Sequence, residues 1–380
     1  MDFELTDEQK MLVETAGNFA KNEFAPVAQE LDREEKYPME IWEKASKLGL
    51  VGAWLPEEYG GAGVGFLGNA LITEQFARVD LGISLIVAAT FGCEAIYWGG
   101  TEEQKKKYLP LVAQGSAISA GAFTEPDAGT DVAGARTRAV IDGNDYVING
   151  NKMFITNADV CTFMVTLCVT NPEDEKRYKR YSLIIVGSDR KGVTTTKIHG
   201  KMGIRASDTA EVSFEDVRVP RENLVGTSEG QGFYQAMQFF DTTRIMVAAQ
   251  GAGLAQGALD KSIEYVKERK AFGVPIATFQ ITQQKLAEMA IRIEATRNLV
   301  YKSASYLDNG KVDPTLNAIT KYYAGETAVF CANYAVELHG GYGYIDEYDV
   351  QRFYRDAKIL QIYEGTKEAE VLTIARRLLT

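Results

Sequence analysis

The fold is decided by the stretch Asp142-Gly143-Asn144-Asp145-Tyr146-Val147-Ile148-Asn149-Gly150-Asn151-Lys152-Met153-Phe154-Ile155, which carries the clearest β-sheet signal in the chain. The pairs Asp142-Gly143 and Asn149-Gly150 are typical of tight turns, and a short apolar string follows each pair. Further β-rich strings occupy residues 162–169, 181–186 and 212–219. The sequence therefore predicts a β-domain in the middle of the chain.

Helical patterns lie on both sides of this domain. Thr6-Asp7-Glu8-Gln9 is a plausible capping box followed by apolar residues at helical spacing, and helices are also expected near residues 39–48 and 101–111. After about Gln231 two further apolar stripes appear, formed by Leu254, Ala258, Leu259, Ser262, Ile263 and Val266, and by Ile281, Leu286, Met289, Ile291 and Ile293. The order of helices, sheet and helices indicates an α+β, mostly α fold whose helices share one bundle around an inserted sheet.

The length of 380 residues allows two or three structural units. We expect an N-terminal all-helical domain over residues 1–119, a middle β-barrel or sandwich domain over residues 120–228, and a C-terminal helical bundle domain over residues 229–380.

The composition excludes several classes of function. A net charge of -11 argues against broad contact with nucleic acid or an anionic membrane. The four cysteines show no C-x-x-C spacing and follow no signal peptide, so we expect reduced, buried thiols in a cytoplasmic protein without membrane insertion. Only two histidines, His199 and His339, are present, and their setting predicts neither a metal site nor a histidine-based hydrolase.

A candidate base lies near the C-terminus, in Gln361-Ile362-Tyr363-Glu364-Gly365-Thr366. A carboxylate between an aromatic ring and a glycine turn is partly desolvated, which raises its pKa and makes it a better base toward a carbon acid. Glu364 could equally be a surface residue at a helix end, and the local sequence leaves both interpretations open.

Two segments at the start of the β-domain suit a flat or anionic ligand. In the loop over residues 122–131, Gly129 leaves room for a ligand to approach the backbone, although a plain tight turn would use the same residues. Phe154 and Thr156 are two residues apart in an expected strand, so both would face one side, where a ring could stack on a planar heterocycle. An ordinary core phenylalanine is the alternative.

Two segments of the C-terminal part are less specific. Arg269 and Lys270 follow a long predicted helix, where capping alone explains two positive charges. The glycine-rich string at residues 338–344 allows close approach to a phosphate, but it lacks the strand, loop and helix order of a nicotinamide-binding fold.

Taken in order, five segments resemble the acyl-CoA dehydrogenase family, and the resemblance extends over essentially the whole chain: 124–131, 154–157, 202–209, 268–273 and 355–366. It implies an N-terminal helical domain, a middle antiparallel β-domain and a C-terminal four-helix bundle, with FAD as cofactor in a homotetramer. The implied reaction is oxidation of an acyl-CoA substrate to its 2,3-enoyl form, with electrons passing to an electron-transferring flavoprotein.

The resemblance also implies residue roles. FAD would be contacted by Ala122, Phe123, Thr124, Gly129, Thr130, Phe154, Thr156, Arg269, Phe272, Gln280, Glu337, Gly340, Gly341, Thr366 and Glu368. Of these, Arg269, Phe272, Gln280 and the turn at Gly340-Gly341 would serve the FAD of a neighbouring subunit. Glutamate replaces the usual glutamine at Glu337 and Glu368, and a carboxylate near a pyrophosphate costs Coulomb energy unless it is solvated or bonded.

The substrate would contact Thr130, Asp241, Arg244, Tyr363 and Gly365 in such an enzyme. Glu364 would remove the α-proton and flavin N5 would accept the β-hydride, while the backbone N–H of Glu364 and a flavin ribityl hydroxyl hold the thioester oxygen. Some relatives place the base at the position of Thr243, where a hydroxyl cannot replace it.

The acyl end of the pocket would be formed by residues 81–91, which contain no Arg or Lys. This favours an apolar acyl group and leaves open whether it is short or medium, branched or alicyclic. An acyl-CoA oxidase or another flavin enzyme on the same fold, and a non-catalytic CoA-thioester binder, remain the alternatives.

Overall fold

The computed structural model describes residues 4–379. Its N-terminal part is helical, with α1 (Asp7–Glu23), α2 (Ala28–Glu34), α3 (Met39–Lys47), α4 (Gly65–Val79), α5 (Leu81–Ser84), α6 (Cys93–Gly99) and α7 (Glu102–Ala113). Thr6 caps α1 through the reciprocal bonds of a capping box with Gln9, as the sequence predicts.

The middle part is one sheet of seven strands. They are β1 (Ser119–Ala122), β2 (Arg138–Asp142), β3 (Asp145–Thr156), β4 (Phe163–Val169), β5 (Tyr181–Gly187), β6 (Val193–Lys197) and β7 (Thr209–Pro220). The path through the sheet is β1-β4-β2-β3-β7-β6, and β5 pairs with β4. Most pairs are antiparallel, whereas β4 runs parallel to both β1 and β2.

Asp142-Gly143 forms the predicted hairpin turn between β2 and β3. The interpretation of Asn149-Gly150 as a second turn is wrong, because β3 continues through this pair and only its register against β7 shifts. Asn149 bonds Asp216 of β7 through both ends of its amide group, at 3.0 and 2.9 Å. Gly150, with φ of 147°, lies against Thr137 where a Cβ would overlap. The pair therefore lies opposite a bulge in β7, and β3 stays paired on both sides of it.

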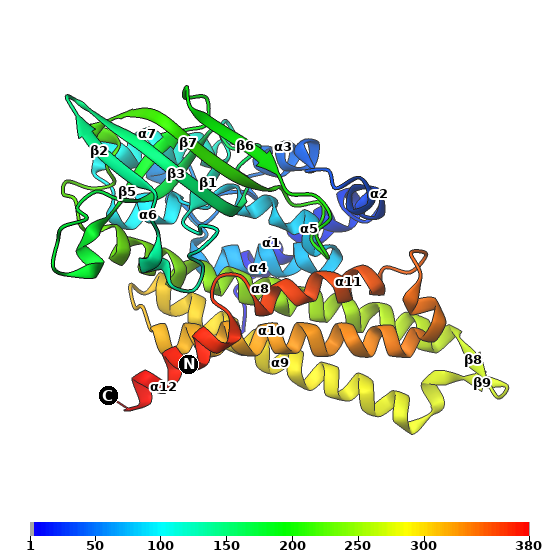
Figure 1. The fold of residues 1–380 in the computed structure, drawn as a ribbon. Coiled ribbons are helices and arrows are strands. Elements are labelled where there is room, and N and C mark those ends of the chain that lie inside the picture. Colours follow the sequence, from blue (N-terminus) through cyan, green and yellow to red (C-terminus); the bar gives the residue numbers. More distant parts are fainter. Residues whose placement is uncertain (1–3, 380) are drawn as a thin grey trace.

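Long helices form the C-terminal part: α8 (Gly232–Glu268), α9 (Gln280–Asp308), α10 (Pro314–His339), α11 (Val350–Ala357) and α12 (Lys367–Leu379). In Figure 1, α8, α9 and α10 run lengthwise beneath the sheet, and the small hairpin of β8 (Lys270–Ala271) and β9 (Val274–Pro275) projects from one end. Helix α4 packs on both α8 and α9, so helices from both ends of the chain share one bundle, as expected.

The core agrees with the predicted helical stripes only in part. The stripe of α8 is largely buried, and so are Met289 and Ile293 of α9, whereas Ile281 is 64% and Ile291 is 68% exposed. The predicted helix is therefore present as α9, but Ile281 and Ile291 point away from the bundle of this chain. All four cysteines are free and buried, as predicted.

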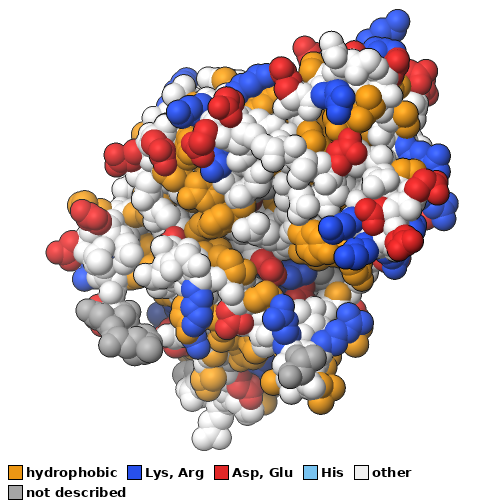
Figure 2. All heavy atoms as spheres, turned by 90° about the vertical axis from the view of Figure 1, so that its left-hand side faces the viewer, with side chains coloured by type: hydrophobic (Ala, Val, Ile, Leu, Met, Phe, Trp, Pro, Cys, Tyr) orange, Lys and Arg blue, Asp and Glu red, His pale blue; other side chains and the backbone are white. Residues whose placement is uncertain are grey.

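The surface mixes charges of both signs. On the face drawn in Figure 2, Lys and Arg side chains lie among Asp and Glu side chains, around a band of hydrophobic side chains. The negative net charge is therefore not gathered into one region of this face. None of the helices within the described residues combines the length and apolar character that a membrane crossing requires.

Candidate active site

The turn that contains Glu364 lies between α11 and α12, against the middle of α8. Glu364 has a left-handed backbone with φ of 54°, and Gly365 follows with φ of 105°. The hydroxyl of Thr243 on α8 donates a hydrogen bond of 2.6 Å to the Glu364 carboxylate, and Arg244 Nε donates to the Glu364 carbonyl oxygen at 3.1 Å. A left-handed glutamate is a strained conformation that its surroundings must hold.

Burial raises the pKa of Glu364, as predicted from the aromatic and glycine neighbours. The hydrogen bond from Thr243 and the charges of Arg244 and Lys321 act in the opposite direction. The neighbouring Tyr363 has a phenol whose pKa is also raised by burial, and it donates to Gln250 Oε1 at 2.5 Å. The site thus holds a carboxylate with a proton affinity above that of a free glutamate.

Thr243 therefore lies beside Glu364, the predicted base. Sequence reasoning rejected Thr243 as a base but did not predict that its hydroxyl would orient the Glu364 carboxylate. The sequence offered no signal for this contact, because Thr243 and Glu364 are 121 residues apart in the chain.

The predicted substrate residues Asp241 and Arg244 lie together in this region. Arg244 Nη1 is 3.0 Å from Asp241 Oδ1, and Arg244 Nε is 3.1 Å from Glu370 Oε1. Burial raises the pKa of Asp241, although the Arg244 charge opposes this. Within the described residues, Arg244 is thus bound to the Glu364 turn and to two carboxylates.

The loop after β1 is held by a buried ion pair that the sequence did not reveal. Lys152 Nζ lies 2.8 Å from Glu125 Oε1, and the same carboxylate accepts from the backbone N–H groups of Arg136 and Thr137 at 2.6 and 2.9 Å. Ala122 and Phe123 are buried, while Gly129 and Thr130 are exposed at the outer side of the loop. Thr124 lies between them and is half-buried.

Phe154 and Thr156 lie on either side of Ile155 at the end of β3, where the register of this strand against β7 shifts. Phe154 is 62% exposed with a left-handed φ of 59°, whereas Ile155 between them is buried. The Thr156 hydroxyl forms no hydrogen bond within residues 4–379. An exposed ring and a free hydroxyl two residues apart fit the flat, polar-edged ring system of a flavin.

Residues 81–90 of the predicted acyl segment are all buried, and Phe91 at its end is partly buried. Phe91 follows, with its ring 6.0 Å from that of Phe239 on α8. The Phe239 carbonyl oxygen lies 3.2 Å from the Thr243 hydroxyl, so this segment is close to Glu364.

Glu94, three residues beyond Phe91, was missed. It is 4% exposed, accepts a hydrogen bond of 3.3 Å from Thr90, and has a second oxygen without a partner in the described part of the chain. Burial raises its pKa to about 8, and the charge of Glu364 contributes to the shift. A carboxyl inside the apolar string after Phe91 was the available signal.

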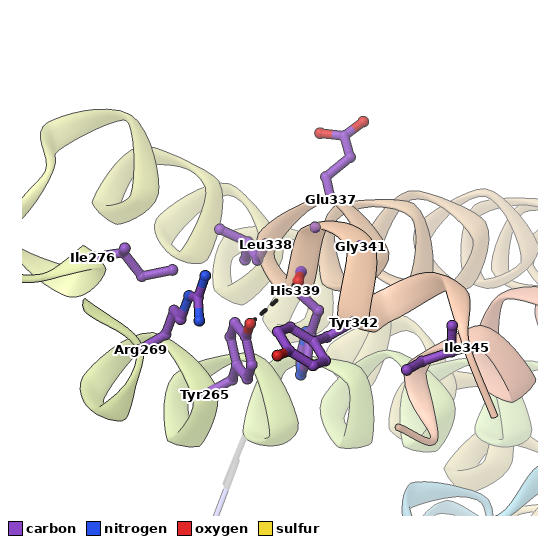
Figure 3. Close-up of a pocket in the computed structure, with 10 residues that line it drawn as sticks. Tyr265, Arg269, Ile276, Glu337, Leu338, His339, Gly341, Tyr342 and Ile345 are labelled. Carbon is purple, nitrogen blue, oxygen red and sulfur yellow. Dashed lines mark hydrogen bonds between the residues drawn. The ribbon is translucent and has the colours of Figure 1, made fainter. Parts of the chain in front are cut away.

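A second region is a cleft of about 520 Å³ at the C-terminal end of α10. It is lined by the predicted residues Arg269, Glu337, Gly340 and Gly341, together with Tyr265, His339 and Tyr342. In Figure 3, Tyr265, Arg269 and Tyr342 turn toward one hollow, and Tyr265 donates to the His339 carbonyl oxygen. Phe154 and Thr156, the residues predicted to lie along the flavin ring, do not line this cleft.

Glu337 points away from the hollow in Figure 3. Its carboxylate lies 2.5 Å from Lys285 Nζ and accepts from Asn333, and the bond from Lys285 holds its pKa below the usual range. The negative charge of Glu337, which would repel a pyrophosphate, is therefore already paired with Lys285.

The remaining predicted cofactor residues lie farther out. Phe272 on the projecting hairpin is 96% exposed, and Gln280 is exposed at the start of α9. Thr366 caps α12 by accepting from the Ala369 N–H at 3.3 Å, and Glu368 is exposed on the first turn of that helix. No group of His, Cys, Asp and Glu side chains among the described residues is arranged to hold a metal ion.

Comparison with protein families matches three consecutive models along the chain. The acyl-CoA dehydrogenase N-terminal domain matches residues 6–116, the middle domain residues 120–217, and the C-terminal domain residues 230–379. A probable acyl-CoA dehydrogenase of Bacillus subtilis is 43% identical over 381 residues, which cover 100% of both chains.

Solved structures agree over the same length. Butyryl-CoA dehydrogenase from Megasphaera elsdenii is similar with a TM-score of 0.96 and 39% identity, covering 100% of both chains. A chain from a study of the electron transferring flavoprotein of Acidaminococcus fermentans and flavin-based electron bifurcation is similar with a TM-score of 0.97 and 40% identity, again over 100% of both.

Proposed function

This chain belongs to the acyl-CoA dehydrogenase family, and on that basis we propose that it oxidises an apolar acyl-CoA thioester to the 2,3-enoyl-CoA with Glu364 as the base. It is an oxidoreductase that acts on CH–CH groups, in common with the relatives named as acyl-CoA dehydrogenases. A non-catalytic thioester binder is therefore the wrong alternative.

The observation that carries this proposal is the setting of Glu364. Its carboxylate has a pKa raised by burial, is oriented by Thr243, and belongs to a turn with a left-handed backbone. The Glu364 backbone N–H has no acceptor within the described residues. A free N–H beside a desolvated carboxylate suits a thioester, whose oxygen would accept that donor as the α-proton moves to Glu364.

Phe154, Thr156 and the loop with Thr124, Gly129 and Thr130 fit a bound flavin ring, and when bound FAD supplies the acceptor for the β-hydrogen. Thr366 and Glu368, which lie close to Glu364 in sequence, are also proposed to contact FAD. The chain's own residues exclude water, orient the acyl chain and hold the proton on Glu364.

Arg269, Glu337, Gly340 and Gly341 belong in this proposal to the FAD of a neighbouring copy, together with Phe272 and Gln280. Their cleft is separate from the residues predicted to lie along the flavin ring, and the almost fully exposed Phe272 projects from the bundle. Exposed Ile281 and Ile291 on α9 support an assembly of several copies, which we take to be a homotetramer.

The acyl group is apolar in this proposal, because residues 81–90 are buried and include no Arg or Lys. Butyryl-CoA is the substrate in the name of one solved relative, which supports testing short chains first. An electron-transferring flavoprotein is the proposed acceptor, supported by the relative from such a system. Free, buried cysteines agree with a reducing compartment such as the cytoplasm.

The test is anaerobic flavin bleaching by a panel of straight, branched and alicyclic acyl-CoA esters. At least one ester should bleach bound FAD and yield the 2,3-enoyl product, and air should reoxidise the enzyme far more slowly than an electron-transferring flavoprotein. Fast oxygen consumption would favour an oxidase, and the absence of bleaching by any ester would contradict the proposed activity.

Glu364→Gln should lower kcat by at least about 100-fold, because the amide cannot accept the α-proton. FAD content and acyl-CoA binding should stay near those of the unchanged protein. Exposed Glu264 on α8 provides a control, since Glu264→Gln should leave kcat unchanged. Ordinary turnover by Glu364→Gln would remove this residue from the role of base.

A further inference from the structure

The strained Glu364-Gly365 turn is held by two cations from different helices. Arg244 of α8 donates to the Glu364 carbonyl oxygen, and Lys321 of α10 donates to the carbonyl oxygen of Gly365. Lys321 is 1% exposed, so its ammonium group has been removed from water to make this contact. Two charged donors on consecutive carbonyls fix the backbone of the base more firmly than neutral donors would.

A buried carboxylate accompanies these cations. Glu370 of α12 is fully buried, with Oε1 3.1 Å from Arg244 Nε. A Cβ added to Gly365 would overlap the same carboxylate, so Glu370 presses directly against the turn. Neither oxygen of Glu370 has a well-formed hydrogen bond within the described residues, which is an expensive arrangement for a buried group.

We propose that Lys321 and Glu370 are positioning residues for the base: with Arg244 they hold the Glu364-Gly365 turn, and their opposite charges balance the proton affinity of Glu364. This inference rests on the proposed role of Glu364. Thr243 fixes the carboxylate, while Lys321 and Glu370 act through the backbone and through charge.

The charged and titratable groups around Glu364 come from every neighbouring element. They are Asp241 and Arg244 of α8, Lys321 of α10, Glu370 of α12, Glu94 of α6 and the adjacent Tyr363. Burial lowers the pKa of Lys321 to about 8, while Glu370 and Glu364 favour its charged form. Lys321 is therefore charged at pH values below about 8.

Two substitutions should move the pH profile in opposite directions. Lys321→Gln removes a positive charge, so the pKa of Glu364 rises and the acid limb of kcat moves to higher pH. Burial raises the pKa of Glu370, whereas the charges of Arg244 and Lys321 favour its ionised form. In that ionised form Glu370→Gln removes a negative charge, so the pKa of Glu364 falls and the limb moves to lower pH. Each shift should be roughly one pH unit. Lys321→Arg should restore a profile close to that of the unchanged protein.

Lys367, three residues beyond Glu364, is the matched control. It is paired with Glu326 at 3.2 Å and is 41% exposed, so solvent screens it and Lys367→Gln should leave the profile in place. A purely structural role for Lys321 and Glu370 would lower stability or kcat without opposite shifts, and shifts of one sign, or none, would overturn the inference.

A second measurement needs no substrate. The unfolding free energies of the protein with and without Glu364→Gln are compared across pH, in the original and in the Lys321→Gln and Glu370→Gln backgrounds. The pH dependence of each difference reports the pKa of Glu364 in that background. Displacements of the Glu364 pKa in opposite directions support the proposed roles of Lys321 and Glu370 even if no acyl-CoA is oxidised, in which case only the proposed function fails. Identical curves in the three backgrounds would contradict these roles.

Discussion

The Glu94 carboxyl has a raised pKa because it is buried. Apolar neighbours enclose it, Thr90 is its hydrogen-bond partner, and its pKa is raised to about 8. A neutral carboxylic acid in this place keeps the region beside the acyl segment free of charge near neutral pH. The sequence indicates the apolar string but not that this particular side chain turns inward.

Glu94→Gln should flatten the pH dependence of stability. In the unfolded chain the carboxyl loses its proton near 4.5, whereas the folded protein keeps it up to about 8. The contribution of this proton to the free energy of unfolding is fully present below pH 4.5, and it is lost as the pH rises through about 8. Denaturant unfolding across this interval should show the variant losing a few kcal/mol less than the unchanged protein.

Glu264→Gln is the control for this comparison, because an exposed carboxylate on α8 gives no such pH dependence. Parallel curves for the unchanged protein and for Glu94→Gln would mean that Glu94 is ionised in the folded state, contrary to this expectation.

At the scale of elements, close approach of α4 and α8 depends on glycine. A Cβ at Gly253 would overlap the carbonyl oxygen of Glu74, and one at Gly257 that of Arg78. Both oxygens belong to α4, so the two helix backbones are in contact without side chains between them. Helix α8 can then carry Thr243 and Arg244 at a fixed distance from the sheet and from the base.

Gly257→Ala should destabilise the protein by about 1–3 kcal/mol, since the backbones must separate to admit a methyl group. Gly257→Val should cost more, and both should reduce FAD retention. Urea unfolding gives the free energies, and Glu264→Ala on the exposed side of α8 should remain within about 0.5 kcal/mol of the unchanged protein. A neutral effect of Gly257→Val would refute the close packing.

At the scale of the whole molecule, ion pairs around α11 join distant parts of the chain. Arg352 lies 2.8 Å from Asp80, both nearly fully buried, and Arg355 lies 2.6 Å from Asp32 of α2. Asp356 accepts the backbone N–H of Ile204 at 2.6 Å. The segment at residues 355–358 thus connects N-terminal, middle and C-terminal parts just before the chain enters the Glu364 turn.

Arg352→Met should destabilise the protein by about 3–5 kcal/mol, because it leaves the Asp80 carboxylate buried without its partner. Adding Asp80→Asn should recover part of that loss, since the uncompensated charge is then removed. The exposed pair of Lys44 and Glu23 serves as control, and Lys44→Met should change stability by less than about 1 kcal/mol. Guanidinium unfolding of the unchanged protein and of the three variants gives the free energies. Equal losses of stability for Arg352→Met and Lys44→Met would disprove the argument.

The amino-acid sequence by itself determined what local patterns encode. Helical periodicity and a capping box place helices at both ends, and the Asp142-Gly143 turn places the sheet between them. The Tyr363-Glu364-Gly365 setting predicts a partly desolvated carboxylate, and in the folded protein burial raises the pKa of Glu364.

Only the tertiary structure decided which distant groups meet. Thr243, Lys321 and Glu370 reach the Glu364 turn from three helices, and Asn149 lies opposite a bulge in β7, where it bonds Asp216. Pairing across such sequence distances depends on packing and on the burial of charge, which no local pattern records. The proposal of Glu364 as the base therefore starts from its own segment, while the position and the pKa of this carboxylate come from the folded molecule.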